Sequence, residues 1–145
     1  MTIAGKWMIM FGKCNADRMW QTIANGLLDG SFPEGILSAK MNLHDDRGKS
    51  HEVVKINIYT KDFSNEREVR EAETAIIERL KRSCTVVEFE SIQIMKYKAE
   101  LYTHVNIFMN NKFGGEGIPP SLYTSTHVGR GKQRKQQLRM RFLQL

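Results

Sequence analysis

The residues best suited to chemistry are six cations near the C-terminal end, with no acidic residue among them. They are Arg130, Lys132, Arg134, Lys135, Arg139 and Arg141. Ammonium and guanidinium groups at this density neutralise phosphates, which gives binding that depends on salt and not on base sequence. Arginine also matches the paired oxygens of a phosphate better than lysine does. Residues 129–145 therefore predict a basic flexible tail that binds RNA phosphates, with a solubilising or nuclear-targeting tail as the alternative.

The rest of the chain carries no net charge. Residues 1–128 hold 16 of the 22 lysines and arginines and all 16 aspartates and glutamates. Because the positive excess is confined to the tail, the sequence lacks the basic footprint of a domain that binds nucleic acid over its whole surface.

The histidines and cysteines show no spacing typical of a metal site. Cys14 and Cys84 have no CxxC partner, and no HxH or HxxxH pair occurs. The histidines are His44, His51, His104 and His127. No serine or cysteine lies in a nucleophile signature. We therefore expect no enzyme activity, no metal, no cofactor and two reduced thiols.

The length of 145 residues fits a single domain. The longest apolar run, residues 7–11, is far shorter than the roughly 20 residues that cross a bilayer. Residues 1–6 lack the basic-then-apolar order of a signal peptide. We expect a cytoplasmic or nuclear protein without a membrane segment, with one domain over residues 1–128 followed by the tail.

A strand that leads into a helix organises the middle of the chain. Val54, Ile56 and Ile58 alternate with polar residues, which is the period of a strand with one buried face. Asn65 and Glu68 then have the spacing of a helix-starting capping box. Apolar residues recur on one face of this helix at Val69, Ala72, Ile76, Ile77 and Leu80.

The remaining elements follow from similar patterns. A first helix is expected between Asn15 and Asp29–Gly30, with an apolar face formed by Met19, Trp20, Ile23, Leu27 and Leu28. Further strand candidates are residues 5–12, 35–43, 85–89, 91–97, 101–109 and 121–126. The second has a one-sided apolar face formed by Leu37, Ala39, Met41 and Leu43, and the fourth has Ile92, Ile94 and Met95 inward. Residues 44–50 are expected to form a hairpin turn, and residues 110–120 a loop. The order predicts an α+β fold, an antiparallel sheet with helices packed on one face.

Several short motifs then suggest a family. They are GKWMIMF (5–11), DRMW (17–20), KINIYT (55–60), NEREV (65–69) and ERL (78–80). Their order and spacing resemble the core of the cap-binding translation initiation factor 4E. The stretches 58–63 and 97–123 are more similar to the uncharacterised family that includes basophilic leukaemia-expressed protein, which shares the initiation-factor-4E-like fold. The resemblance covers residues 5–126 and leaves the tail outside.

The resemblance implies a curved sheet and a phosphate contact. Lys55 aligns with a lysine that contacts phosphate in factor 4E, and Tyr59 stands where that family has tryptophan. The two tryptophans that stack on the methylated guanine of the cap lie upstream of the first shared strand in that family. The resemblance therefore implies that the cap slot is absent here, and that the domain lacks its first strand.

The aromatic residues have structural readings beside the functional ones. Trp7 and Trp20 are expected to pack in the core and not to form a stacking pair. Lys55 is either a phosphate ligand or a solvated lysine on a strand face. The aromatic residues of the C-terminal part are expected to pack as a lid over the sheet or to line a groove: Tyr97, Tyr102, Phe113 and Tyr123.

Taken together, the patterns predict a non-catalytic RNA-associated domain in which Lys55 and the tail hold phosphates. The alternative is a protein–protein interaction module that uses the outer helix face, next to Met19, Trp20 and Ile23.

Overall fold

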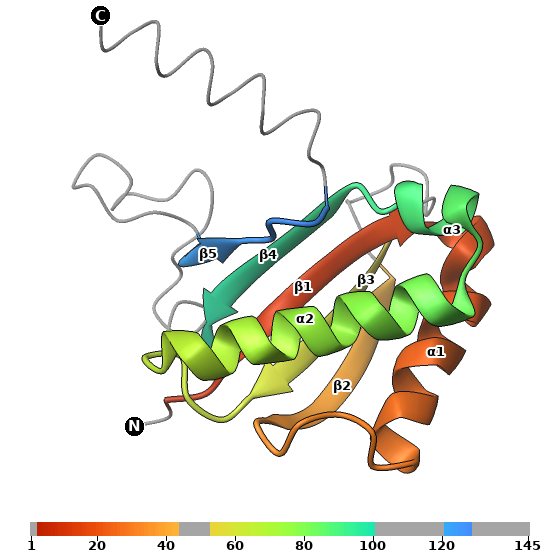
Figure 1. The fold of residues 1–145 in the computed structure, drawn as a ribbon. Helices are drawn as coiled ribbons and strands as arrows, with labels where there is room; N and C mark the ends of the chain where they lie inside the picture. The colour runs from red at the N-terminus through yellow and green to blue at the C-terminus, as the bar shows by residue number, and fades with distance from the viewer. Residues whose placement is uncertain (1–2, 44–52, 101–120, 129–145) are drawn as a thin grey trace, which may run out of the picture.

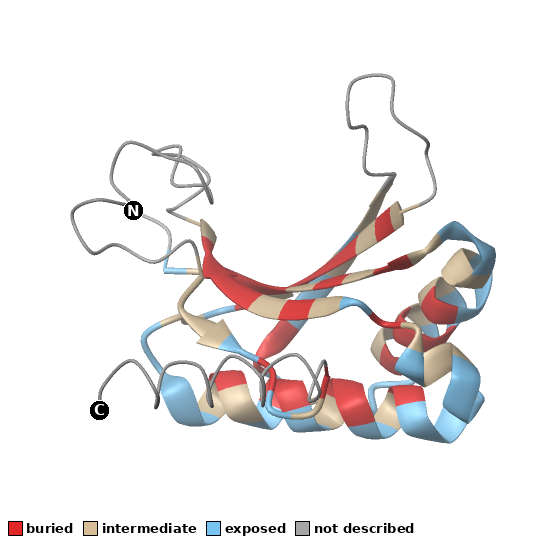
Figure 2. Cartoon of the chain, turned by 90° about the horizontal axis from the view of Figure 1, so that it is seen from above, coloured by how far each residue is buried: buried red, intermediate tan, exposed pale blue. Residues whose placement is uncertain are grey.

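A five-stranded antiparallel sheet carries the helices on one of its faces (Figures 1 and 2). The computed structural model describes residues 3–43, 53–100 and 121–128. The elements in chain order are β1 (Gly5–Gly12), a 3-10 turn (Lys13–Asn15), α1 (Ala16–Leu28), β2 (Ile36–Leu43), β3 (Val53–Thr60), α2 (Glu66–Ser83), α3 (Val86–Glu90), β4 (Ile94–Ala99) and β5 (Tyr123–Thr124). The strand order is β2-β3-β1-β4-β5. The predicted α+β class is confirmed.

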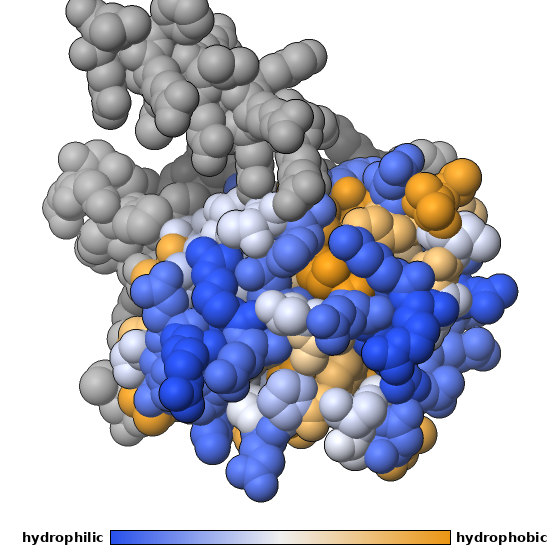
Figure 3. Space-filling view, in the orientation of Figure 1, coloured by the Kyte–Doolittle hydropathy of each residue, from blue (hydrophilic) through white to orange (hydrophobic). Residues whose placement is uncertain are grey.

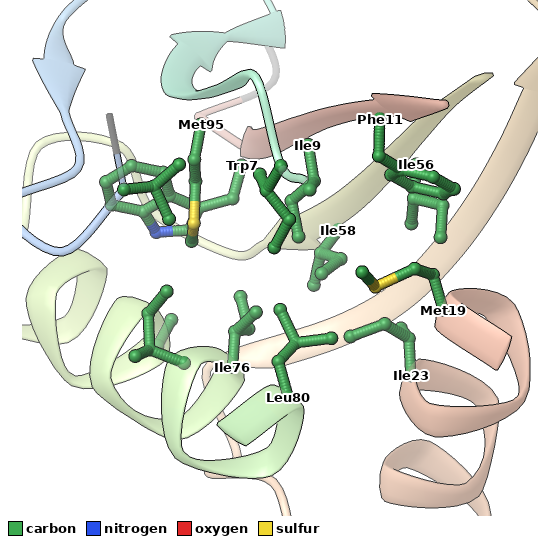
Figure 4. Close-up of a cluster of buried hydrophobic side chains, with 14 of the residues drawn as sticks. Trp7, Ile9, Phe11, Met19, Ile23, Ile56, Ile58, Ile76, Leu80 and Met95 are labelled. Atoms are coloured by element: carbon green, nitrogen blue, oxygen red, sulfur yellow. The ribbon is translucent and has the colours of Figure 1, made fainter. Parts of the chain in front are cut away.

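The core lies between the sheet and the two long helices (Figure 4). On β1, Trp7, Ile9 and Phe11 are at most 1% exposed, and the three apolar residues predicted to point inward from β3 are fully buried. The Trp7 indole Nε1 donates a hydrogen bond to the carbonyl oxygen of Val69 on α2, at 3.0 Å. This bond satisfies the one polar group of a buried tryptophan and ties the central strand to α2.

Helix α2 begins and ends as its sequence predicts. The Asn65 side chain accepts a hydrogen bond from the backbone N–H of Glu68 at 3.2 Å, which satisfies one of the free donors of the first turn. Lys81 and Arg82 lie in the last turn, next to the carbonyl end. All five predicted apolar positions of this helix are buried.

Helix α1 agrees with the prediction except in its N-cap hydrogen bond and at Leu28. The predicted end at Asp29–Gly30 is confirmed, since Asp29 is the C-cap and Gly30 follows with a φ of 71°. Asn15 occupies the N-cap position, but its side chain donates to the Ser91 hydroxyl at 2.8 Å and makes no cap hydrogen bond. Leu28 is 84% exposed, so its predicted place on the apolar face is wrong. It lies five residues after the buried Ile23, which turns its side chain away from the sheet.

Residues 85–89 form a helix and not the predicted strand. The Thr85 hydroxyl accepts from the Glu88 N–H at 3.1 Å, and the Glu88 carboxylate accepts from the Thr85 N–H at 2.8 Å. This capping box starts α3 in spite of the two β-branched residues that suggest a strand, Val86 and Val87.

Two side chains also point to a different face from the one predicted. In β4, Met95 is buried against the helices as expected, whereas the half-buried Ile94 lies on the opposite face. In β2, Ile36 is buried and Leu37 is 57% exposed. A register shift between Ile36 and Ser38 reverses the alternation at that point.

The segment 121–128, which contains β5, pairs with the sheet edge and is hydrogen-bonded to α2. The predicted edge strand is present as two residues that pair with β4. The Arg70 guanidinium donates to the carbonyl oxygen of Thr124 at 3.2 Å, and Glu73 accepts from the Thr126 N–H at 2.9 Å. The expected turn 44–50, strand 101–109, loop 110–120 and tail 129–145 lie outside the described residues.

Candidate nucleic-acid interface

The sheet face away from the helices is concave and carries most of the polar strand residues (Figure 2). Directly opposed residues of antiparallel strands point to the same side, so the pairing defines its members. We call this surface the lysine face. It consists of Lys6, Met8, Met10, Ser38, Lys40, Asn42, Lys55, Asn57, Tyr59, Ile94, Lys96 and Lys98.

The lysine face is ordered in rows across the sheet. One row places Tyr59, Lys6 and Lys98 side by side on β3, β1 and β4. The next row contains Asn57 and Met8 between two further lysines, Lys40 on β2 and Lys96 on β4. Lys55 lies in the third row, opposite Met10 and Asn42.

Lys55, the one strand residue predicted to contact phosphate, is half-buried on this face. Burial lowers its pKa first, and repulsion from Lys6 lowers it further. The charged form of Lys55 is therefore less favoured on this face than in water, and a nearby anion would favour it.

Lys6 and Lys98 are the most buried cations of the face, each with 7% of its surface exposed. Burial lowers the pKa of Lys98, with repulsion from Lys6 and Lys55 adding to the effect and Glu100 opposing it. Lys6 Nζ lies 3.3 Å from Glu100 Oε2. This carboxylate offsets part of the positive charge of the face.

Tyr59 and Asn57 supply the uncharged groups of the site. Lys6 Nζ lies 5.9 Å from the centre of the Tyr59 ring. Burial and the charge of Glu100 raise the pKa of Tyr59, against a hydrogen bond with the Asn57 side chain. Asn57 is only 3% exposed, and its Oδ1 has no hydrogen-bond partner among the described residues.

The chemistry that this arrangement allows is anion binding. Among the described residues, the lysine face carries five ammonium groups, and Glu100 is the carboxylate beside them. No cluster of three or more histidine, cysteine, aspartate or glutamate side chains suited to a metal occurs in the part of the chain that the structure describes.

The other sequence-based sites have structural explanations where the structure describes them. Trp7 packs in the core as expected, and Trp20 is half-buried against it. Cys14 and Cys84 are free thiols. Tyr97 is fully buried next to Trp7 in the core, with the ring centres 5.3 Å apart. Five further candidates lie outside the described residues: His44, His51, His104, Tyr102 and Phe113.

The remaining lysines of the face were missed from the sequence. They come from the first, second and fourth strands, and their shared face depends on strand register, which no local pattern reveals: Lys6, Lys40, Lys96 and Lys98. The six predicted tail cations lie outside the described residues, so the structure brings only Lys55 of the predicted site into this cluster. None of the described helices is long and apolar enough to cross a membrane.

A comparison with protein families assigns the chain to a family. A family model described as Basophilic leukemia-expressed protein Bles03 matches residues 1–106. The chain belongs to this family. The Bles03 match includes β1 to β4 and therefore every residue of the lysine face, whereas β5 and the tail lie beyond it. No curated protein matches the sequence.

Proposed function

We propose that this Bles03-family chain is a non-catalytic RNA-associated protein that binds the phosphates of a single strand on its lysine face and with its basic tail. The observation that carries the proposal is the gathering of five lysines on one concave sheet face, beside which the described residues place the single carboxylate of Glu100. A row of cations that follows a curved surface neutralises successive phosphates.

The electrostatics of the face support an anionic ligand. Burial lowers the pKa of both Lys55 and Lys98, and the charge of Lys6 lowers each of them further. A phosphate placed between Lys55 and Lys98 reverses this repulsion into attraction. Tyr59 adds an aromatic ring on the same surface, on which a base can stack.

We also propose that the fold is of the initiation-factor-4E-like type but without a cap slot. The concave sheet, with helices on its convex side, supports this assignment. Trp7 is fully buried and Trp20 is half-buried against the core, so the two tryptophans are unavailable as a pair of stacking rings. Capped and uncapped RNA are therefore expected to bind with the same affinity.

Fluorescence anisotropy of a labelled single-stranded RNA tests the proposal. The full chain is titrated over a salt series, beside a variant with the six tail cations changed to glutamine and a Lys55→Met variant. The tail variant is expected to reduce the magnitude of the salt slope by up to about 4, and Lys55→Met by about 0.7. Lys81→Met, on the helix side, is the matched control and leaves the slope unchanged.

Three results contradict the proposal. Absence of binding at low salt removes the RNA function altogether. A normal slope for Lys55→Met with a loss only in the tail variant removes the lysine face from the site. A preference for capped RNA contradicts the absence of a cap slot.

A second candidate, a protein-interaction module, is favoured by one observation. Val86 and Val87 on α3 are 73% and 78% exposed, and Figure 3 shows a hydrophobic patch over α3 on an otherwise mainly hydrophilic side. The surface first expected, around Met19 and Ile23, is not available because both side chains are buried. Cross-linking with a Val87→Cys variant in cell extract, with Leu28→Cys as control, tests this surface.

A further inference from the structure

The most unusual polar group of the lysine face is the amide oxygen of Asn57. The side chain is 3% exposed, and its Oδ1 accepts no hydrogen bond from the part of the chain that the structure describes. A buried acceptor without a donor costs folding free energy, about 1–3 kcal/mol in proteins. Native structures rarely keep such a group unless it has a use.

The neighbours of Asn57 explain what kind of group is missing. Met8 lies directly opposite on β1 and offers no donor, and Lys40 lies opposite on β2 without a hydrogen bond to the Oδ1. The Asn57 side chain is already hydrogen-bonded with Tyr59. Lys6 and Lys55, on either side along the strands, repel one another. A ligand that draws the ammonium groups toward itself therefore has to bring both negative charge and a hydrogen-bond donor.

A ribose–phosphate backbone carries both. Its phosphates offer only acceptors, and the donor of its sugar is the 2′-hydroxyl, which DNA lacks. The flexible lysine side chains can follow the phosphates while the strand-borne Asn57 stays fixed.

We infer that Asn57 is a specificity-determining residue, whose Oδ1 accepts a hydrogen bond from a ribose 2′-hydroxyl while the surrounding lysines hold the adjacent phosphates. This inference rests on the proposed RNA binding and deepens it, because it gives the site a means of choosing RNA over DNA without reading a base. Asn57 makes this contact from the middle of β3, the strand between β1 and β2.

The test compares three labelled strands of one sequence on the full-length wild-type protein: RNA, 2′-fluoro RNA and DNA. Fluorine accepts but cannot donate a hydrogen bond, and 2′-fluoro RNA keeps an RNA-like sugar pucker. We expect RNA to bind about tenfold more tightly than either of the other two strands, the cost of leaving one buried acceptor unpaired. Asn57→Leu is expected to bring RNA affinity down to that of DNA and to change DNA affinity by less than about twofold.

The matched control is Asn42→Leu, which removes an amide from the same face on β2 and is expected to keep the RNA preference. Folding of each variant is checked by its urea midpoint, and the wild-type comparison of the three strands stands even where Asn57→Leu fails to fold. Equal binding of all three strands by the wild type overturns the role of Asn57 and leaves the proposed RNA binding intact. An equal loss of RNA and DNA affinity in Asn57→Leu also overturns it. Failure of every strand to bind at low salt removes the proposed function itself.

Discussion

Lys6 lies directly opposite Lys98 on the paired strands β1 and β4, and each lysine keeps only 7% of its surface exposed. Like charges opposite one another on a sheet destabilise the pair. Glu100 Oε2 lies 3.3 Å from Lys6 Nζ and lowers this cost. Repulsion from Lys6 still lowers the pKa of both Lys55 and Lys98, so the three lysines interact across the face.

The first prediction concerns the cost of Lys55. Changing Lys55 to methionine keeps the length of the side chain and removes a partly desolvated charge that Lys6 repels. Because water screens the exposed part of the charge, we expect a modest rise in the free energy of unfolding, about 0.5–1 kcal/mol. Urea denaturation measures it, and a lower midpoint than wild type contradicts the electrostatic account of the face.

The second prediction concerns the close contact between Gly5 and Tyr97. A Cβ atom built on Gly5 overlaps the phenol ring, with Cε1 only 2.7 Å away. Gly5→Ala is therefore expected to lower the free energy of unfolding by about 1–3 kcal/mol, the range of an overpacked core. Gly12→Ala, at the other end of β1, is the control, since its Cβ meets nothing closer than Cys14 Sγ at 3.8 Å. Equal midpoints for the two variants would refute the contact.

The third prediction concerns the buried Glu73, which forms an ion pair with Arg70 at 3.1 Å. Arg70→Met leaves this carboxylate without its cation and also removes the hydrogen bond to Thr124. We expect a loss of about 3–5 kcal/mol. A double variant with Glu73→Gln is expected to recover part of it, and limited proteolysis is expected to cut near residues 121–128 faster in the single variant. An additive double variant argues against the ion pair.

The fourth prediction concerns alkaline pH. Burial raises the pKa of Tyr97 to about 12, above the ordinary value of 10.0. Between these values the unfolded chain releases the phenol proton while the folded chain retains it, so the unfolded state binds fewer protons and stability falls as pH rises. The contribution is complete below pH 10 and lost near pH 12, about 2–3 kcal/mol in all.

Urea midpoints between pH 9 and 12 measure this slope for wild type and for Tyr97→Phe. The variant is expected to lose the Tyr97 part of the slope, together with the 2.5 Å hydrogen bond between the Tyr97 and Thr60 hydroxyls. Adding Thr60→Val removes the second partner and is expected to restore part of the neutral-pH stability. Identical slopes for wild type and Tyr97→Phe contradict the raised pKa.

The sequence predicted those elements whose signals are local. The alternation in β3, the cap at Asn65 and the apolar face of α2 all lie within a few residues of one another. The prediction of a strand at residues 85–89 was wrong. Val86 and Val87 favour a strand, but the Thr85–Glu88 capping box starts a helix there.

The candidate site depended on information that is not local. Lys55 was found through a resemblance, but its neighbours Lys6 and Lys98 come from distant segments that only the sheet register brings together. The same holds for Leu37, where a register shift reversed the predicted face. Periodicity gives the two faces of each strand, but it does not say which strands are adjacent.

The central claim, that the lysine face binds RNA, is tested most directly by amide chemical-shift mapping of the full-length protein titrated with uncapped single-stranded RNA. The account predicts the largest shifts on β1, β3 and β4 around Lys6, Asn57 and Lys98, with no change on α3. Shifts confined to α3 around Val87, or to the tail without the sheet, would contradict the account.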